Sequence, residues 1–486
     1  MRVVVVGAGR VGFSLCRHLV QENHEVSLIE IDEERARHAS NRLDCLVIHD
    51  QGNSIQGLEE GGIDRADALV CVTGSDELNM IICGLAASRY PELVKIARVR
   101  NSEYVRFYRE GPPTKLGTTA SLGTTPLGID HFIHPDVEAA RWALSAVDRG
   151  AMGEVLVFPG APYELGSVEI APESPLDGLA LRDYRKLHPG DSLVTLVERQ
   201  GESFLPDGSS SLHAGDRVHI FVRGEETEEV FRLAGQGGPA PRRIGIVGGS
   251  RIGALIAGGL LHPERQEEPP GRDIEGFGRT FRSFLKTLRP KHLRRITIIE
   301  QDYQLCKDLS ARFPEALVLN EDISDESFVA EERINDLDLI ITATGHQELN
   351  IITALYLKSR GVRRAIALVS GTGYGIMARQ LGVNVVIPTA QVVVDSILAR
   401  LSGVRGLHRF GDAGIFELEV KAEAPAAEKP IAAFHAGSGA LLMLANRDGD
   451  SFIPRGDYVF KAADRVIVIA KHGNEKELEK FFAVDL

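Results

Sequence analysis

The first twelve residues constrain the fold of this chain more than any other stretch. Val3 to Val6 form an apolar, β-branched run that predicts a buried strand of a parallel sheet. Gly7, Gly9 and Gly12 follow with the G-x-G-x-x-G spacing of a dinucleotide-binding turn. In such a turn the first glycine permits the bend, the second lets a pyrophosphate approach the backbone, and the third lets the next helix pack on the sheet. The spacing therefore predicts a Rossmann-like unit that binds a nucleotide.

A carboxylate follows at the distance that this interpretation requires. A second strand is expected from Glu25 to Ile29, and Glu30 ends it about twenty residues after the turn, where it would accept the ribose hydroxyls. A carboxylate prefers a free 2′-hydroxyl to a 2′-phosphate, which favours NAD or an adenosine nucleotide over NADP. Asp32 is expected to cap the next helix. The alternative is a Rossmann-like unit that has lost its ligand.

Two arginines follow on a later strand. The expected strand Val94 to Val99 carries Arg98 and, at its end, Arg100. Residues two apart on a strand share a face, so both guanidiniums would be placed to bind the phosphates of a nucleotide. Surface ion pairs are the alternative for both. Thr73 and Gly74 end another strand beside the ligand, and Asn79 would either orient that turn or begin the next helix.

The same programme occurs twice along the 486 residues. Ile244 to Gly253 restates the opening strand and turn, and Thr344 to Ile352 restates Thr73 to Ile81. Strands that alternate with helices predict α/β architecture, namely two Rossmann-like, doubly wound parallel-sheet domains, each followed by a small β-rich α+β domain. The expected segments are a nucleotide-binding domain (1–134), a crossover helix (135–150), a small domain (151–235), a linker (236–241), a second nucleotide-binding domain (242–388) with an insertion at about 262–292, a second crossover helix (389–402) and a second small domain (403–486).

Composition excludes several classes of function. A formal net charge of −13 argues against nucleic acid as the main partner. None of the five cysteines belongs to a C-x-x-C or Cys/His metal spacing, so no metal site is expected. We expect these cysteines to be buried thiols of a protein in a reducing cytoplasm. No apolar run is long enough to span a bilayer, and the N-terminus does not read as a signal peptide.

The chain resembles the Trk-type potassium-uptake regulators (TrkA-like proteins), which carry tandem RCK or KTN modules, each an RCK_N domain followed by a small RCK_C domain. The resemblance spans nearly the whole chain, and its specific segments are 7–12, 73–80, 96–100, 129–133 and the Ser174-Pro-Leu pattern of the small domain. It implies a cytoplasmic ring, assembled from dimers into a tetramer, on the inner face of the membrane under a TrkH-like potassium transporter. It also implies that NAD(H), ATP or ADP switches the shape of the ring and so gates ion flow.

The resemblance also places a contact to the adenosine moiety after the third strand, where either Asp50 or Gln51 could supply it. The candidate ligand residues of the first site are Gly7, Ala8, Gly9, Arg10, Val11, Gly12, Glu30, Asp50, Gln51, Thr73, Gly74, Asn79, Arg98 and Arg100.

The second site departs from the pattern. Ser250 replaces the middle glycine, and Leu368 and Ser370 stand where the first half has its two arginines. We therefore expect a weaker, altered or empty site, with Gly248, Gly249, Ser250, Arg251, Ile252, Glu300, Asp322 and Thr344 as its candidate residues. The insertion carries phenylalanines and leucines at helical spacing between basic residues, which predicts either a helix that touches the membrane or transporter or one that packs on protein.

The small segments show no nucleophile–base pair, so no catalytic residue and no enzymatic activity are expected. An NAD-dependent oxidoreductase is the alternative, although such an enzyme needs an acid/base group beside the nicotinamide that this sequence does not offer. A regulator of a different ion transporter is the second alternative.

Overall fold

The computed structural model of the chain describes residues 1–21, 24–109, 127–151, 153–157, 161–237, 240–262, 294–323, 325–401, 408–410, 413–435, 439–447, 449–471 and 473–483. The expected loop at 111–125 and nearly all of the insertion at 262–292 lie outside these residues, so the two hypotheses for the insertion stay predictions.

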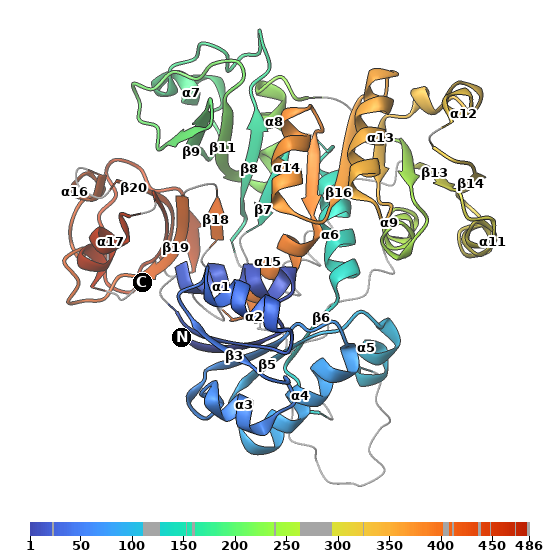
Figure 1. Cartoon of the computed structure of the whole chain (residues 1–486). Helices are drawn as coiled ribbons and strands as arrows, with labels where there is room; N and C mark the ends of the chain where they lie inside the picture. The colour runs from blue at the N-terminus through green and yellow to red at the C-terminus, as the bar shows by residue number, and fades with distance from the viewer. Residues whose placement is uncertain are drawn as a thin grey trace, which may run out of the picture.

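Two six-stranded parallel sheets form the larger part of the molecule (Figure 1). The first has the order β3-β2-β1-β4-β5-β6, with β1 (Arg2–Val6), β2 (Glu25–Glu30), β3 (Leu46–His49), β4 (Ala68–Cys71), β5 (Val94–Arg98) and β6 (His131–Ile133). The second has the corresponding order β14-β13-β12-β15-β16-β17, with β12 (Arg243–Val247), β13 (Arg295–Glu300), β14 (Leu317–Asn320), β15 (Leu339–Thr342), β16 (Arg364–Val369) and β17 (Val385–Pro388). This strand order is that of a doubly wound nucleotide-binding sheet, so the predicted fold class and the internal repeat are confirmed.

Helices connect the parallel strands of each sheet. Those of the first half are α1 (Arg10–Gln21), α2 (Glu33–Ser40), α3 (Ile55–Glu60), α4 (Asp76–Arg89) and α5 (Ser102–Arg109). Those of the second half are α9 (Arg251–Leu261), α11 (Tyr303–Arg312), α12 (Glu326–Glu331), α13 (Gln347–Ser359) and α14 (Thr372–Gln380). The expected cap of α2 is confirmed, because the Asp32 side chain accepts a hydrogen bond from the Arg35 amide.

Each parallel sheet is followed by a small, mainly antiparallel one, and the two small sheets share one order. The first runs β10-β9-β11-β8-β7, with β7 (Glu154–Val157), β8 (Tyr163–Glu169), β9 (Ser192–Arg199), β10 (Glu202–Phe204), β11 (Arg217–Arg223) and the helices α7 (Leu181–Leu187) and α8 (Thr227–Leu233). The second runs β21-β20-β22-β19-β18, with β18 (His408–Phe410), β19 (Ala413–Glu419), β20 (Ala440–Arg447), β21 (Asp450–Phe452), β22 (Arg465–Lys471) and the helices α16 (Ile431–His435) and α17 (Glu475–Phe482).

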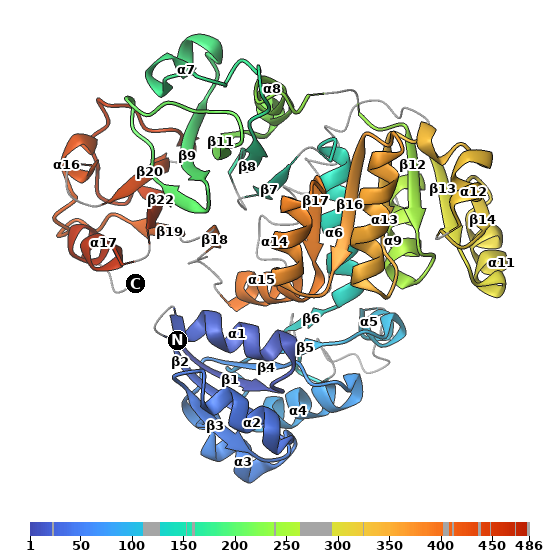
Figure 2. The same cartoon turned by 45° about the horizontal axis from the view of Figure 1, so that its top comes forward.

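The two small sheets pack against each other. One buried cluster draws Tyr163, Leu165 and Phe221 from the first and Met443 and Ile469 from the second. Both small domains therefore adjoin in space although about two hundred residues separate them in sequence, as Figure 2 shows on its upper left.

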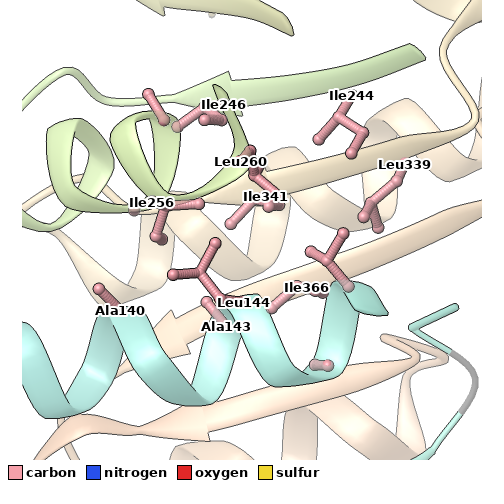
Figure 3. Packing of buried hydrophobic residues seen from close by; sticks show 14 of the residues in the cluster. Ala140, Ala143, Leu144, Ile244, Ile246, Ile256, Leu260, Leu339, Ile341 and Ile366 are labelled. Carbon is pink, nitrogen blue, oxygen red and sulfur yellow. The ribbon is translucent and has the colours of Figure 1, made fainter. Parts of the chain in front are cut away.

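The helix that leaves the first large sheet packs on the second half. This helix is α6 (Pro135–Asp148), and its buried face includes Ala140, Ala143 and Leu144. These side chains meet Ile256 of α9 and Ile366 of β16 in one apolar cluster (Figure 3). Two arginines of the second half bind the far end of the helix, since Arg294 donates to the Asp148 carboxylate at 2.9 Å and Arg364 donates to the Gly150 carbonyl at 2.7 Å.

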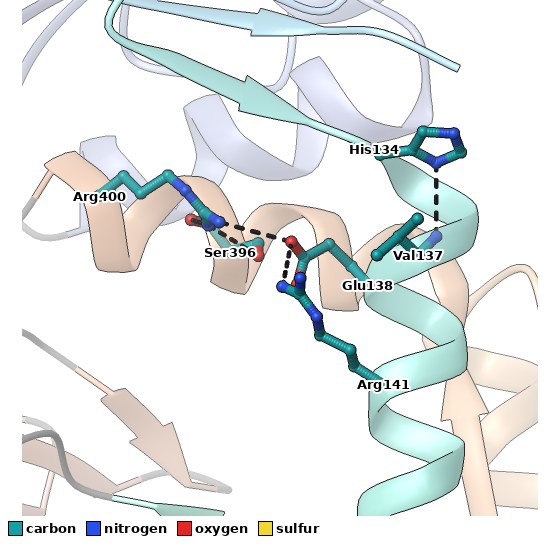
Figure 4. A network of polar contacts seen from close by, with 6 residues as sticks. All are labelled: His134, Val137, Glu138, Arg141, Ser396 and Arg400. Atoms are coloured by element: carbon teal, nitrogen blue, oxygen red, sulfur yellow. Dashed lines mark hydrogen bonds and ion pairs between the residues drawn. The ribbon is translucent and has the colours of Figure 1, made fainter. Parts of the chain in front are cut away.

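The reciprocal helix makes the same exchange. α15 (Thr389–Leu401) leaves the second large sheet and buries Val393, Val394 and Ile397 against β1 and α1 of the first half. Each half therefore completes the core of the other. Where α6 and α15 cross, Glu138 of α6 accepts from Arg141 at 3.3 Å and from Arg400 of α15 at 3.4 Å (Figure 4).

Asp395 of α15 makes the stability of the chain depend on pH. Burial raises the pKa of this carboxyl to about 6, and its Oδ1 accepts from the Gln391 amide at 2.8 Å. Because the pKa in the folded state lies above that of the unfolded chain, stability is lost as pH rises between about 4 and 6 and stays lower above that range. Asp395→Asn should therefore raise the free energy of unfolding by about 1–2 kcal/mol at pH 7.5 and by nothing near pH 4. Thermal melts across this range check it, with the exposed Asp308→Asn as control; an equal gain at both pH values would contradict it.

Candidate functional site

The glycine turn between β1 and α1 forms the floor of the first site. Gly7 has φ +103°, a conformation that L side chains rarely adopt. A Cβ at position 12 would lie 1.8 Å from the Gly7 carbonyl oxygen, whereas a Cβ at position 9 would meet no atom within 4 Å. The third glycine is therefore needed for the fold, while the middle one leaves open space above the start of α1, where a phosphate could reach the helix amides.

Glu30 ends β2 and is held by backbone amides on both sides. Its Oε2 accepts from the Ala8 amide and its Oε1 from the Asp32 amide at 2.9 Å. The side chain is buried, yet each carboxylate oxygen keeps a second lone pair for a hydroxyl donor. This geometry fits the predicted ribose contact.

Asp50 and Gln51 follow β3 and differ in exposure. The Asp50 carboxylate accepts from the Gln51 amide at 2.7 Å, and hydrogen bonds from the Ser54 hydroxyl and then this amide lower the pKa of Asp50. Asp50 is thus a charged residue of its own loop, while Gln51 is exposed. Which of the two contacts the nucleotide stays a prediction.

Asn79 fixes the turn that follows β4. Its Oδ1 accepts from the Thr73 amide at 2.9 Å and from the Thr73 hydroxyl at 2.7 Å, and its Nδ2 donates to the Arg98 carbonyl at 2.8 Å. The side chain is fully buried, and α4 begins three residues earlier with Ser75 as its cap. Of the two roles considered for Asn79, the structure shows the one that orients the turn.

The arrangement of Arg98 and Arg100 corrects the expectation from sequence. β5 ends at Arg98, so Arg100 lies beyond the strand and the two do not share a strand face. The Arg98 residue is buried, with 8% of its surface exposed, whereas Arg100 is exposed. The backbone amide of Arg100 donates a hydrogen bond to the Asp76 carboxylate at 2.8 Å. The Asp76 carboxylate was missed from sequence, although an acidic residue in the first turn of α4 is a readable signal.

Arg98 is a buried guanidinium with unused capacity to donate. Its Nη2 donates to the Thr73 carbonyl at 2.5 Å, but its Nε is buried and has no hydrogen-bond partner among the residues that the structure describes. Burial, and then the nearby Arg100, lower the pKa of Arg98 to about 10, so it stays charged at neutral pH. An unsatisfied buried N–H carries a free-energy cost that an anionic ligand would remove.

Arg251 connects the second half to the first site. It begins α9, directly after the second glycine turn, yet its Nη1 donates to the Arg100 carbonyl at 2.9 Å and lies 3.8 Å from the Asp136 carboxylate. Its counterpart Arg10 is exposed, and the Arg10 side chain makes no hydrogen bond or ion pair to another described residue. From the sequence, Arg251 is expected in the second site only. Its contact with the first half is possible because α6 and α15 each pack on the opposite half.

The second site keeps the frame of the first without its cations. Glu300 accepts from the Gly249 amide at 2.7 Å and the Asp302 amide at 2.9 Å, and the Asn350 side chain holds Thr344 as Asn79 holds Thr73. The Ser250 hydroxyl donates to the Ala343 carbonyl at 3.3 Å. The remaining candidates Gly248, Ile252 and Asp322 lie in the corresponding turns, and the loss of both guanidiniums leaves weak or absent binding as the expectation.

Two classes of site are not found in the part of the chain that the structure describes. It contains no group of three or more histidine, cysteine or carboxylate side chains placed to hold a metal ion. None of its helices combines the length and the apolarity that crossing a bilayer requires.

Both kinds of domain in this chain match known domain families. Residues 3–115 and 274–389 match the TrkA-N domain, and residues 165–235 and 415–483 match the TrkA-C domain. The chain belongs to the TrkA-like family. The four matches alternate along the chain in the order that the tandem repeat requires.

Relatives and solved structures agree with this membership. A Trk system potassium uptake protein TrkA homolog from Archaeoglobus fulgidus is 29% identical, with 99% of this chain and all of that protein aligned. A Trk system potassium uptake protein TrkA from Azorhizobium caulinodans is 24% identical over the whole of this chain and 99% of its own length. The GsuK channel bound to NAD shares the fold with a TM-score of 0.55 at 16% identity, covering 99% of this chain and 79% of that one.

Proposed function

We propose that the chain is a nucleotide-sensing regulatory subunit that assembles under a membrane potassium transporter, of the TrkH-like kind, and gates K⁺ uptake. The single observation that carries the nucleotide part is Arg98 at the end of β5, in the sheet whose first turn is Gly7 to Gly12, because its buried Nε finds no hydrogen-bond partner within the described part of the chain. The transport part rests on the full-length relatives, which are named as potassium uptake proteins.

The ligand that we propose is NAD(H), ATP or ADP, bound in the first half. Glu30 would hold the ribose, the amides that begin α1 would hold the phosphates next to it, and Arg98 with Arg100 would hold the terminal phosphate. A solved structure of the same fold carries NAD, which is in keeping with this ligand class.

The gating that we propose acts through the helix exchange. Each crossover helix is part of the core of the opposite half, and Arg251 bonds to the backbone of Arg100. A ligand that moves Arg100 therefore acts on α9 of the second half as well. This gives a nucleotide a mechanical route to the shape of the whole chain.

Self-association is part of the proposal. Large apolar side chains are exposed on α13 (Ile352), on α14 (Ile376 and Met377) and at Leu381, directly after α14. Exposed large apolar side chains are suited to burial against a second copy of the chain, in dimers or tetramers. We place the assembly in the cytoplasm, attached to the inner face of the membrane through its transporter, and without enzymatic activity. Steady turnover of NADH with a small carbonyl substrate would favour the oxidoreductase alternative instead.

The test is calorimetric titration of the full chain with ATP, ADP, NAD and NADH. Arg98→Met keeps an apolar stem in the buried position but removes the donor, so affinity for at least one of these ligands should fall tenfold or more, since hydrogen bonds to charged groups contribute roughly 1.5–3 kcal/mol. The exposed Arg182→Met is the matched control and should bind like the parent.

Light scattering on the same samples reports the mass of the assembly, and K⁺ flux into vesicles that hold the transporter reports gating. Absence of binding by the parent chain would remove the nucleotide switch. If the chain binds nucleotide but the K⁺ flux does not change with nucleotide, the chain regulates a different transporter.

A further inference from the structure

His134 occupies the junction between β6 and α6, at the edge of the first site. Its backbone is extended, with φ −102° and ψ 105°, and its Nδ1 accepts from the Val137 amide at 3.4 Å (Figure 4). The next residue, Pro135, has no amide hydrogen to satisfy. The cap of the helix that crosses to the second half is therefore an imidazole, where serine, threonine, aspartate or asparagine is the usual choice.

An imidazole caps a helix in only one protonation state. Nδ1 can accept from the Val137 amide while it carries no proton, which places the proton of the neutral ring on Nε2. A second proton on Nδ1 would turn this acceptor into a donor that faces another donor. It would also put a positive charge at the positive end of the helix dipole.

The surroundings of His134 favour the neutral ring. The residue is 7% exposed, and burial is the main cause that lowers its pKa. Asp136 of its own helix and Asp76 of α4 oppose this shift, while Arg251 of α9 adds to it.

The first turn of α6 holds polar contacts between the halves. The Asp136 carboxylate lies 3.8 Å from Arg251 of α9. Figure 4 shows the second contact, in which Glu138 binds Arg400 of α15. Arg251 also donates to the Arg100 carbonyl. A looser first turn would thus loosen contacts to two elements of the second half.

The corresponding junction of the second half, between β17 and α15, carries no titratable cap. β17 corresponds to β6 in strand order, and Pro388 is its last residue before α15 where His134 precedes α6. Proline does not titrate, so the junction before α15 lacks the protonation chemistry of the junction before α6.

We propose that His134 is a proton-sensitive cap, whose protonation releases the first turn of α6 and weakens the polar contacts between the two halves. The direction follows from the lowered pKa of this histidine: its contribution to stability is complete above about pH 6.5 and is lost as pH falls below that value. The device is independent of any nucleotide, so it holds or fails separately from the proposed function.

The test is hydrogen exchange of the full chain between pH 8 and pH 5.5, compared at equal pH for the parent and His134→Asn. Asparagine caps helices well and does not titrate, so the variant should keep its protection. At pH 5.5 the parent should exchange about fivefold faster than the variant in the first turn of α6, which is what loss of a cap corresponds to, and also in the first turn of α9. At pH 8 the two should agree. The exposed His213→Asn is the control and should follow the parent throughout.

Parallel profiles of the parent and His134→Asn from pH 8 to 5.5 would overturn the proposal. Faster exchange in α6 without any change in α9 would overturn the link between the halves. If the variant does not fold, the NMR titration of the His134 ring in the parent decides: a ring that is neutral at pH 7 and charges below 6.5 supports the cap, and a ring already charged at pH 7 rules it out.

Discussion

Gly12→Ala should destabilise the first half by about 3 kcal/mol or more and abolish the nucleotide binding that we propose for it. The added Cβ would lie 1.8 Å from the Gly7 carbonyl oxygen and 3.0 Å from its carbon, both backbone atoms that cannot rotate away. α1 would have to move off the sheet, and the backbone amides that we propose as the phosphate contact would move with it. Chemical denaturation and calorimetric titration measure the two effects.

Gly9→Ala is the matched control for this prediction. The new methyl group meets no atom within 4 Å, so the free protein should unfold like the parent. Nucleotide affinity should still fall, because the methyl group projects into the space that a pyrophosphate would cross. If Gly12→Ala melts with the parent, the close packing of α1 is wrong; if Gly9→Ala binds nucleotide unchanged, the ligand lies elsewhere.

The sequence predicts the fold well because each local signal agrees with the repeat. Val3 to Val6, the glycine turn and Glu30 lie in the predicted places, and α6 (Pro135–Asp148) lies in the segment 135–150 expected as a crossover helix. A pattern that occurs twice along one chain is read twice, so a misread element in one half is corrected by the other.

Contacts between the halves could not be predicted in this way. Nothing in α6 or α15 says which sheet it will cover, because both faces of a doubly wound sheet accept an apolar helix. For the same reason the contact of Arg251 could not be predicted. Its position in the sequence assigns it to the second glycine turn, but its side chain donates to the Arg100 carbonyl in the first half. Arg98 and Arg100 show the limit of strand periodicity, which holds only as far as the strand itself.

Ile397→Asp should destabilise the chain by about 3–5 kcal/mol, and the damage should show in the half to which α15 does not belong in sequence. Ile397 is fully buried in the cluster that contains Val5 and Leu15 of the first half. The residues of this cluster are all apolar, so a carboxylate at position 397 would have no cation among them as a partner. Hydrogen exchange should therefore rise in β1 and α1, nearly four hundred residues earlier in the sequence.

Ala399→Asp tests whether the effect comes from the buried face or only from a new charge on α15. Ala399 is exposed on the same helix, so this variant should exchange and melt like the parent within about 0.5 kcal/mol. Faster exchange of Ile397→Asp confined to residues 242–401 would contradict the helix exchange. Faster exchange in both halves would mean that the two Rossmann-like units unfold as one cooperative body, because each crossover helix belongs to the core of the opposite half.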